Sequence, residues 1–258
     1  MGIVNATPDS FSDGGLFLEA QAGLDHALRL VGEGADILDI GGESSRPGAE
    51  PVAEADEIAR VVPLIAGTAA RTSVPISIDT VKPAVARAAM AAGASIWNDI
   101  AALTAPGAPQ TAAELGCEVI LMHMQGEPRT MQAAPRYEDV VAEVCDFLLQ
   151  RAEVAMAAGV ARERIWLDPG IGFGKTLDHN LALLAALDRI VALGFPVLLG
   201  ASRKSFLSKL DPAAKHPAHR LGGSLAAALA GATAGVAAVR VHDVAETVQA
   251  LRVWEAVR

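Results

Sequence analysis

The sequence predicts an α/β fold, a (β/α)8 or TIM barrel that forms one domain over residues 1–258, and three observations support it. Eight short apolar segments are each followed by a segment with helical character. The apolar segments are continuous runs rich in Val, Ile and Leu, as is typical of parallel strands covered on both faces. Polar residues follow at least seven of the eight segments, so the carboxyl ends of the strands are the expected site of the chemistry.

Each expected strand ends where Gly, Pro or a polar residue interrupts the apolar run. After the apolar run at residues 165–167, for example, the strand stops at Asp168, and Pro169 and Gly170 force a turn. A carboxylate at the end of an apolar strand is costly unless it is paired, so Asp168 is expected to have a partner or a ligand. The expected strands are residues 1–5, 35–40, 75–79, 94–100, 117–124, 164–168, 196–201 and 236–241.

A helical segment follows each expected strand. The third one begins with Pro83, which is tolerated in a first turn because its missing N–H would have no partner there. The fifth is the longest, and the eighth closes the chain. The expected helices are about residues 18–33, 52–68, 83–92, 110–115, 137–158, 178–193, 218–232 and 244–257.

An open, doubly wound parallel sheet is the alternative fold. It would place a site at one switch point and use only two or three strand ends. In this chain polar residues follow nearly every strand, and only closure of the sheet brings all of those ends to one mouth. The barrel is therefore favoured.

Composition excludes several classes of function. The formal net charge is −9, whereas a protein that binds nucleic acid is normally basic. We expect no membrane span because no stretch reaches about 18 uninterrupted apolar residues. The N-terminus lacks the basic region and apolar core of a signal peptide. Cys117 and Cys145 are the only cysteines and form no metal or redox motif, which indicates buried thiols and a cytoplasmic location.

One group of strand-end residues suits a phosphate or pyrophosphate. Arg240 and His242 lie two apart on a strand and should face the same side, where a guanidinium fork beside an imidazole can bind phosphate. Ser45 and Arg46 add a hydroxyl and a second guanidinium, and Asn5 could hold a hydrated divalent metal or a phosphate oxygen. Taken singly, His242 is explained equally well as a hydrogen-bonded residue at the barrel rim.

A second group suits a flat heterocycle with a guanidine-like edge. Asp79, Asn98 and Asp168 can accept several N–H groups, and Lys204 can donate to a ring carbonyl. Met122 is apolar and deformable enough for one face of a ring. An internal ion pair between Lys204 and a carboxylate is the alternative, and it is compatible with ligand binding.

Two other motifs do not meet their requirements. Residues 174–176, Gly-Lys-Thr, look like the end of a phosphate-binding P-loop, but the required upstream glycine falls on Pro169. Residues 42–46 lack the closing glycine of a nucleophile elbow. Neither motif predicts a function here.

With these residues identified, the chain resembles the dihydropteroate synthase family over its whole length. The resemblance implies a TIM-barrel enzyme that joins p-aminobenzoate to 6-hydroxymethyl-7,8-dihydropterin pyrophosphate and releases pyrophosphate. The resembling stretches, in chain order, are residues 5–15, 39–48, 77–80, 98–99, 122–126, 167–175, 201–206 and 240–243.

The resemblance also implies a role for each group of residues. The positions of Asp79, Asn98, Asp168 and Lys204 hold the pterin. Two loops, residues 7–15 and 44–48, close over the site, and a homodimer forms through the last helices. The residues implied to bind the pyrophosphate are Arg240, His242, Asn5 and Ser45, with Mg2+ on the Asn5 side. Those implied to form the p-aminobenzoate pocket are Phe11, Pro47, Phe173 and Ser202.

The sequence departs from the family pattern at three points. Val81 stands where an aromatic or polar residue is more usual after the Asp-Thr pair, and we expect little consequence from it. Ser45 stands where the family usually has Thr, and the chain begins directly at its first strand without the usual leader, which we expect to affect stability rather than chemistry.

A related barrel class passes the methyl group of methyltetrahydrofolate to a corrinoid protein, but has no need of the Arg240 and His242 pair. A non-catalytic pterin-binding scaffold would require a broken polar set, and every expected position is filled here.

Overall fold

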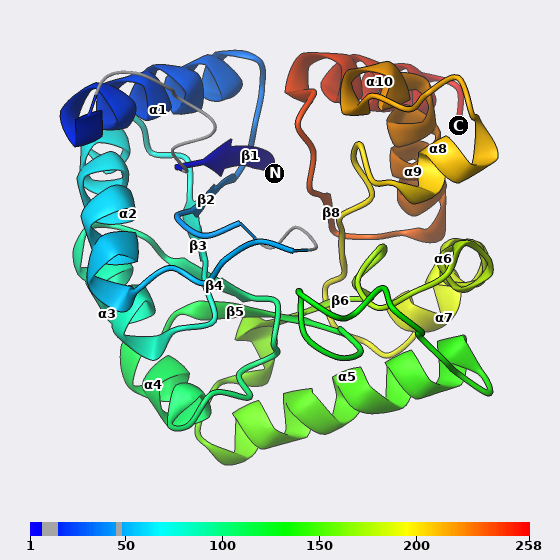
Figure 1. The fold of residues 1–258 in the computed structure, drawn as a ribbon, viewed down its shortest axis with the longest axis horizontal. Coiled ribbons are helices and arrows are strands. Elements are labelled where there is room, and N and C mark those ends of the chain that lie inside the picture. The colour runs from blue at the N-terminus through cyan, green and yellow to red at the C-terminus, as the bar shows by residue number, and fades with distance from the viewer. Residues whose placement is uncertain (7–14, 45–47) are drawn as a thin grey trace.

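Parallel strands alternate with helices around a closed ring in the computed structural model, which describes residues 1–6, 15–44 and 48–258 (Figure 1). Neighbouring strands in the first sheet follow chain order. The strands of that sheet are β1 (Gly2–Asn5), β2 (Leu38–Gly41), β3 (Ile76–Asp79), β4 (Ile96–Asp99), β5 (Glu118–Met122) and β6 (Ile165–Asp168).

A second parallel pair, β7 (Leu198–Leu199) and β8 (Ala238–Val239), completes the ring. The bridge between Leu167 and Val197 joins β6 to the segment that leads into β7, and the bridge between Gly2 and Val241 joins β1 to the segment after β8. At the second junction the Ile3 N–H donates to the Val241 carbonyl over 3.0 Å. The sheet is therefore closed, so the TIM-barrel prediction is confirmed and the open-sheet alternative is wrong.

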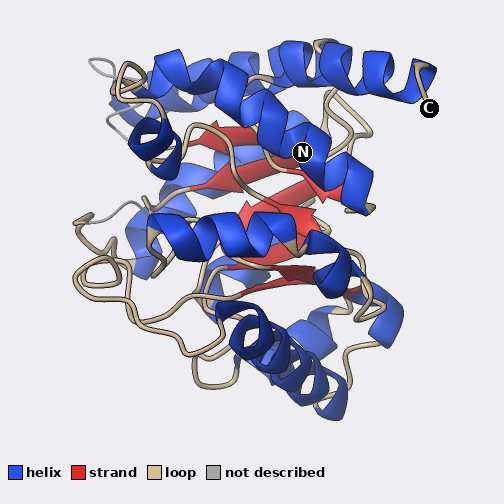
Figure 2. Cartoon of the chain, turned by 90° about the vertical axis from the view of Figure 1, so that its right-hand side faces the viewer, coloured by secondary structure: helices blue, strands red, loops and turns tan. Residues whose placement is uncertain are grey.

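Helices surround the strands, as the side view in Figure 2 shows. Most begin within a few residues of the expected positions. None of the helices in the described ranges has both the length and the apolarity that a membrane span requires. The helices are α1 (Gly15–Gly32), α2 (Glu54–Ala69), α3 (Pro83–Ala91), α4 (Ala108–Leu115), α5 (Val140–Ala157), α6 (Leu177–Ala185), α7 (Leu187–Val191), α8 (Phe206–Leu210), α9 (Leu221–Ala234) and α10 (Val244–Ala256).

The structure corrects two of the expected helices. The helix expected over residues 178–193 is divided at Ala186, whose backbone angles (φ −113°, ψ 25°) are not helical. The helix expected from residue 218 is preceded by a 3-10 turn at Pro217–Arg220, and α8 was not predicted at all. A helix of five residues such as α8 is too short to leave a periodic pattern.

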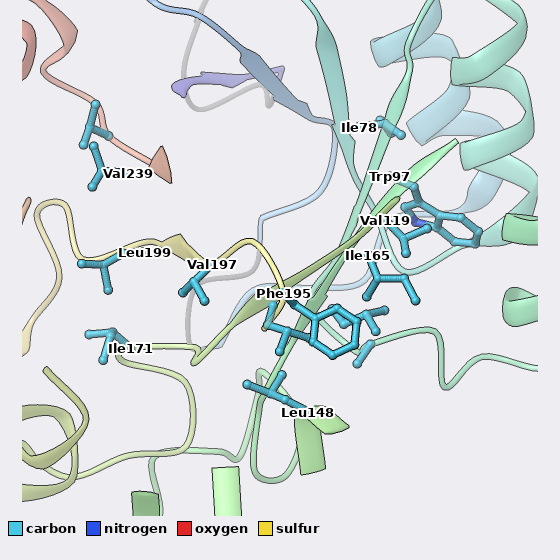
Figure 3. Packing of buried hydrophobic residues seen from close by; sticks show 14 of the residues in the cluster. Ile78, Trp97, Val119, Leu148, Ile165, Ile171, Phe195, Val197, Leu199 and Val239 are labelled. Carbon is cyan, nitrogen blue, oxygen red and sulfur yellow. The ribbon is translucent and has the colours of Figure 1, made fainter. Parts of the chain in front are cut away.

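Strand alternation separates two apolar clusters. Side chains that point outward pack against the helices; Ile78, Trp97, Val119 and Ile165 are among them (Figure 3). The inward side chains make a smaller cluster at the amino ends of the strands, formed by Met1, Ile96, Ile120 and Leu198. Towards the carboxyl ends of the strands the inward positions include the polar residues Asp79, Asn98 and Asp168. The barrel therefore has an apolar base and a polar carboxyl end.

Candidate functional site

The barrel brings the expected strand-end residues to one end. Asp79 is paired in register with Asn98, and Met122 with Asp168. Each follows an inward-facing position by two residues, as Asn98 follows Ile96, so alternation directs the side chains into the barrel. Asn98, Met122 and Asp168 are buried, with 3–5% of their surface exposed. They form the floor of a site at the carboxyl end of the strands.

Arg240 is held between two carboxylates. Its Nε donates to Asp39 Oδ2 over 2.5 Å, and its Nη2 donates to Asp79 Oδ2 over 2.9 Å. The Asn98 amide also donates to Asp39 Oδ2, over 3.2 Å. Asp39 is fully buried, and among the described residues its other oxygen has no hydrogen-bond partner. The network links β2, β3, β4 and the segment after β8 across the barrel.

Sequence reasoning missed Asp39 as a site residue, although a signal was present. Asp39 lies inside the apolar run Ile37-Leu38-Asp39-Ile40, where a charge requires a partner. Which partner it has depends on barrel closure, because Arg240 lies 201 residues away in the chain.

Burial shapes the charges of the site. It raises the pKa of Asp79 to about 7, although the Arg240 guanidinium opposes this shift. It also raises the pKa of Asp168, against the field of Lys204. Burial opposes the charge of Arg240 as well, but Asp39 and Asp79 more than offset it, so the pKa of Arg240 is raised. Arg240 therefore stays a cation, while the carboxylates can respond to a ligand.

Lys204 lies beside the loop that follows β6. Its Nζ donates to the Ile171 carbonyl and lies 4.5 Å from the centroid of the Phe173 ring. Asp168 Oδ1 accepts from the Gly170 N–H over 2.7 Å. Burial lowers the pKa of Lys204 to about 8, and Arg240 lowers it further while Asp168 opposes the shift. Among the described residues, Lys204 bonds this carbonyl and forms no ion pair with a carboxylate.

Asn5 and His242 line a cavity of about 310 Å³. His242 Nδ1 lies 3.0 Å from Ser202 Oγ, which also accepts from the His242 N–H over 3.2 Å. Arg203 lines the same cavity and is tied to Asp243 through its Nε, over 3.0 Å. The wall mixes cationic and acidic side chains, so it suits an anion that arrives with its own counter-ion.

A second cavity, of about 420 Å³, opens next to Asp79. Its wall is largely apolar and includes Val81, Ile100 and Met124. A flat ring that hydrogen-bonds Asp79 could therefore extend over an apolar surface. The predicted residues Phe11, Ser45, Arg46 and Pro47 lie outside the described residues.

The described residues offer few ligands for a divalent metal. In the described ranges no three His, Cys, Asp or Glu side chains gather into a potential metal site. Asn5 supplies one amide oxygen at the cavity wall. Mg2+ characteristically keeps several waters and binds through one or two protein oxygens plus substrate phosphates. The residues present fit an ion that is held mainly by a bound phosphate.

Known proteins share this arrangement of sequence and fold. The family described as "Pterin binding enzyme" matches residues 1–242. The dihydropteroate synthase of Escherichia coli (strain K12) is 49% identical over 256 residues, which cover 99% of this chain and 90% of that protein.

Two solved structures from Xanthomonas albilineans superpose on the whole chain. Its dihydropteroate synthase with 4-aminobenzoic acid has a TM-score of 0.94 at 52% identity and is covered to 92%. The enzyme in complex with 7,8-dihydropteroate has a TM-score of 0.90 at 49% identity and is also covered to 92%.

Proposed function

The chain belongs to the dihydropteroate synthase family of pterin-binding enzymes, and from this premise we propose its reaction. It transfers the pterin methylene group of 6-hydroxymethyl-7,8-dihydropterin pyrophosphate to the amine of p-aminobenzoate, giving 7,8-dihydropteroate and pyrophosphate. The observation that carries the proposal is the buried floor of Asn98, Met122 and Asp168 beside Asp79 and Lys204. These groups complement the edge and one face of a pterin.

The floor accounts for recognition of the pterin. Asp79, Asn98 and Asp168 accept the N–H groups of its amino-pyrimidine edge, and Lys204 donates to its ring carbonyl. A ligand N–H group donates to these buried oxygens, so it favours the ionised carboxylates that burial alone disfavours. Met122 supports one face of the ring.

The pyrophosphate binds next to the pterin floor, where Arg240 reaches Asp79. Arg240, His242, Asn5 and Ser45 bind its oxygens, and Arg46 adds a second guanidinium. Arg240 already bonds Asp39 and Asp79, but a guanidinium has five N–H donors, so it can also bond a phosphate oxygen. Asn5 would hold Mg2+, which neutralises charge on the leaving group when bound.

The reaction needs no protein nucleophile. The bond between the methylene carbon and the pyrophosphate oxygen breaks, and the amine nitrogen of p-aminobenzoate bonds to that carbon and loses a proton. Asp79 and Asp168, ionised with the pterin bound, stabilise the positive charge that develops on the pterin. Phe11, Pro47, Phe173 and Ser202 hold p-aminobenzoate in line with the carbon, so most of the rate enhancement comes from positioning and electrostatics.

Three further assignments belong to this proposal. The enzyme works in the cytoplasm, and it forms a homodimer through its last helices. Val253 of α10 and Val257, which directly follows that helix, support the dimer because they are 61% and 77% exposed. Transfer of a methyl group from methyltetrahydrofolate to a corrinoid protein is disfavoured, because about half identity over nearly the whole chain links it to synthases.

The test is pyrophosphate release by the purified protein with Mg2+ and the dihydropterin pyrophosphate, with and without p-aminobenzoate. We expect release that requires p-aminobenzoate and forms dihydropteroate in equal amount. Pterin binding without release under either condition would contradict the proposed reaction.

A further inference from the structure

Lys175 is a buried lysine that no part of the proposed reaction uses. Burial, reinforced by the charge of Lys204, lowers its pKa to about 7, so the side chain is a cation on the acid side of neutrality. It lies in the loop after β6, and only 1% of its surface is exposed. Its Nζ donates to the carbonyls of Gly170 and Phe173, each over 3.0 Å, and lies 2.9 Å from His123 Nδ1. It also reaches the His123 carbonyl over 3.3 Å. A buried lysine with this many backbone partners organises the loop around itself.

The neighbouring imidazole is suited to this contact. Burial, reinforced by the charge of Lys175, lowers the pKa of His123 to about 3, so the ring is neutral and its Nδ1 can accept. The ring meets Phe147 edge-on, with centroids 4.9 Å apart. This contact from α5 fixes the orientation of the acceptor.

The loop after β6 packs directly against the loop after β5. Gly170 has φ +65°, and a Cβ there would lie 1.9 Å from the His123 carbonyl oxygen. Gly174 has φ +60°, and a Cβ there would lie 2.3 Å from the Gln125 carbonyl oxygen. Backbone therefore meets backbone at both positions, and Lys175 bonds both loops from within.

The same loop contacts the polar floor. Its Ile171 carbonyl accepts from Lys204, and its Phe173 ring lies 4.5 Å from the Lys204 ammonium. A Cβ on Gly172 would lie 2.9 Å from Lys204 Cδ. The N–H of Gly170 donates to Asp168. A change in loop position would therefore displace both charged groups.

We propose that Lys175 is a positioning residue for the pterin site, which fixes residues 170–174 so that Asp168 and Lys204 meet the pterin in one geometry. The inference rests on the proposed function. It also gives a structural role to the Gly-Lys-Thr segment at residues 174–176, which only imitates a P-loop. The charge of Lys175 favours the ionised form of Asp168 and so lowers its pKa, against the effect of burial.

The experiment compares Lys175→Met, which removes the donors and the charge, with Lys175→Gln, which keeps a neutral donor. Leu148→Ala is the control for a general loss of stability, because Leu148 is fully buried in the core and belongs to α5 rather than to either loop. KM for both substrates, kcat and the pH profile are measured on folded protein, with affinity for the dihydropterin pyrophosphate measured separately without p-aminobenzoate.

We expect K175M to raise KM and Kd for the dihydropterin pyrophosphate at least tenfold. K175Q should raise the pterin KM less, and in both variants the acid limb of kcat/KM should move to higher pH. L148A should change none of these values more than twofold. If K175M does not fold, K175Q tests the proposal alone. The proposal then requires an acid limb at higher pH and a KM for the dihydropterin pyrophosphate raised at least threefold.

The role of Lys175 would be overturned if folded K175M had a KM for the dihydropterin pyrophosphate within twofold of the unmodified enzyme. The same KM in K175Q, together with an unshifted acid limb, would also overturn it. An unmodified protein without synthase activity would instead overturn the proposed function, so the two failures are distinguishable.

Discussion

Asp168 carries its charge at the centre of the pterin floor. Replacing it by Asn keeps an oxygen that can accept from the Gly170 N–H, so the fold should be retained. The variant loses a charge-assisted hydrogen bond, worth about 1.5–3 kcal/mol, so kcat/KM should fall roughly 10- to 100-fold. Steady-state kinetics together with a thermal unfolding curve checks this expectation. Near-normal turnover in D168N would remove Asp168 from the site.

Lys204 should set the alkaline limit of activity. Burial lowers its pKa to about 8, so the ammonium that donates to the pterin carbonyl is lost as pH rises through that value. We expect kcat/KM for the pterin substrate to fall above about pH 8. Lys204→Arg keeps its charge at this pH, so the residual activity of K204R should not fall above about pH 8.

Stability should respond to the same lysine in the opposite direction. The unfolded chain binds this proton up to a pKa near 10.5, whereas the folded chain releases it near 8. Between these values the unfolded state holds more protons, so the contribution of Lys204 to the free energy of unfolding rises with pH. Denaturant titrations at pH 7.5 and 9.5 would measure this change. A larger rise in K204R than in the unmodified protein would contradict the assignment.

At the scale of single residues, the sequence predicted those at strand ends better than those within or after strands. Asp79, Asn98 and Asp168 were predictable because each ends an apolar run. Asp39 was not named, since its partner Arg240 becomes a neighbour only on closure. Lys175 was set aside with a failed motif, and its burial follows from contacts between two loops that no local pattern encodes.

At the scale of elements, α5 depends on a cap that can be removed. Asp139 Oδ1 accepts from the N–H groups of Val141 and Ala142, each over 3.0 Å. Asp139→Ala should lower the free energy of unfolding by about 1 kcal/mol, because these donors lose their acceptor. Urea titration measures the loss, and Asp139→Ser, which restores a cap, is the matched control. Equal stability of D139A and D139S would show that the cap contributes nothing.

Helix and strand boundaries were less predictable than the order of the elements. The strands expected over residues 196–201 and 236–241 are reduced to Leu198–Leu199 and Ala238–Val239. Apolar content indicates a buried strand. The number of its residues that are hydrogen-bonded in the sheet depends on how the adjacent strands align with it. The division between α6 and α7 at Ala186 similarly leaves no mark in an apolar run.

At the scale of the whole molecule, closure of the barrel builds the site. The strand pairs with the fewest paired residues lie next to that site. Three or four residue pairs join each described neighbour pair from β1 to β6. Two pairs join β7 to β8, and isolated bridges join these strands to the rest of the described sheet. Arg240, which binds carboxylates of β2 and β3, comes directly after β8.

Native-state hydrogen exchange should therefore begin at β7 and β8. We expect the amides of Leu199 and Val239 to exchange faster than those of Ile78 and Val119, because fewer ladder bonds must open together. Binding of the dihydropterin pyrophosphate should slow exchange most at β8, since the ligand ties Arg240 to the floor supplied by β3 and β4. Mass spectrometry on peptides from each strand can measure both effects. Uniform exchange across the barrel would mean that it opens as one unit and that β7 and β8 are no less stable than the other strands.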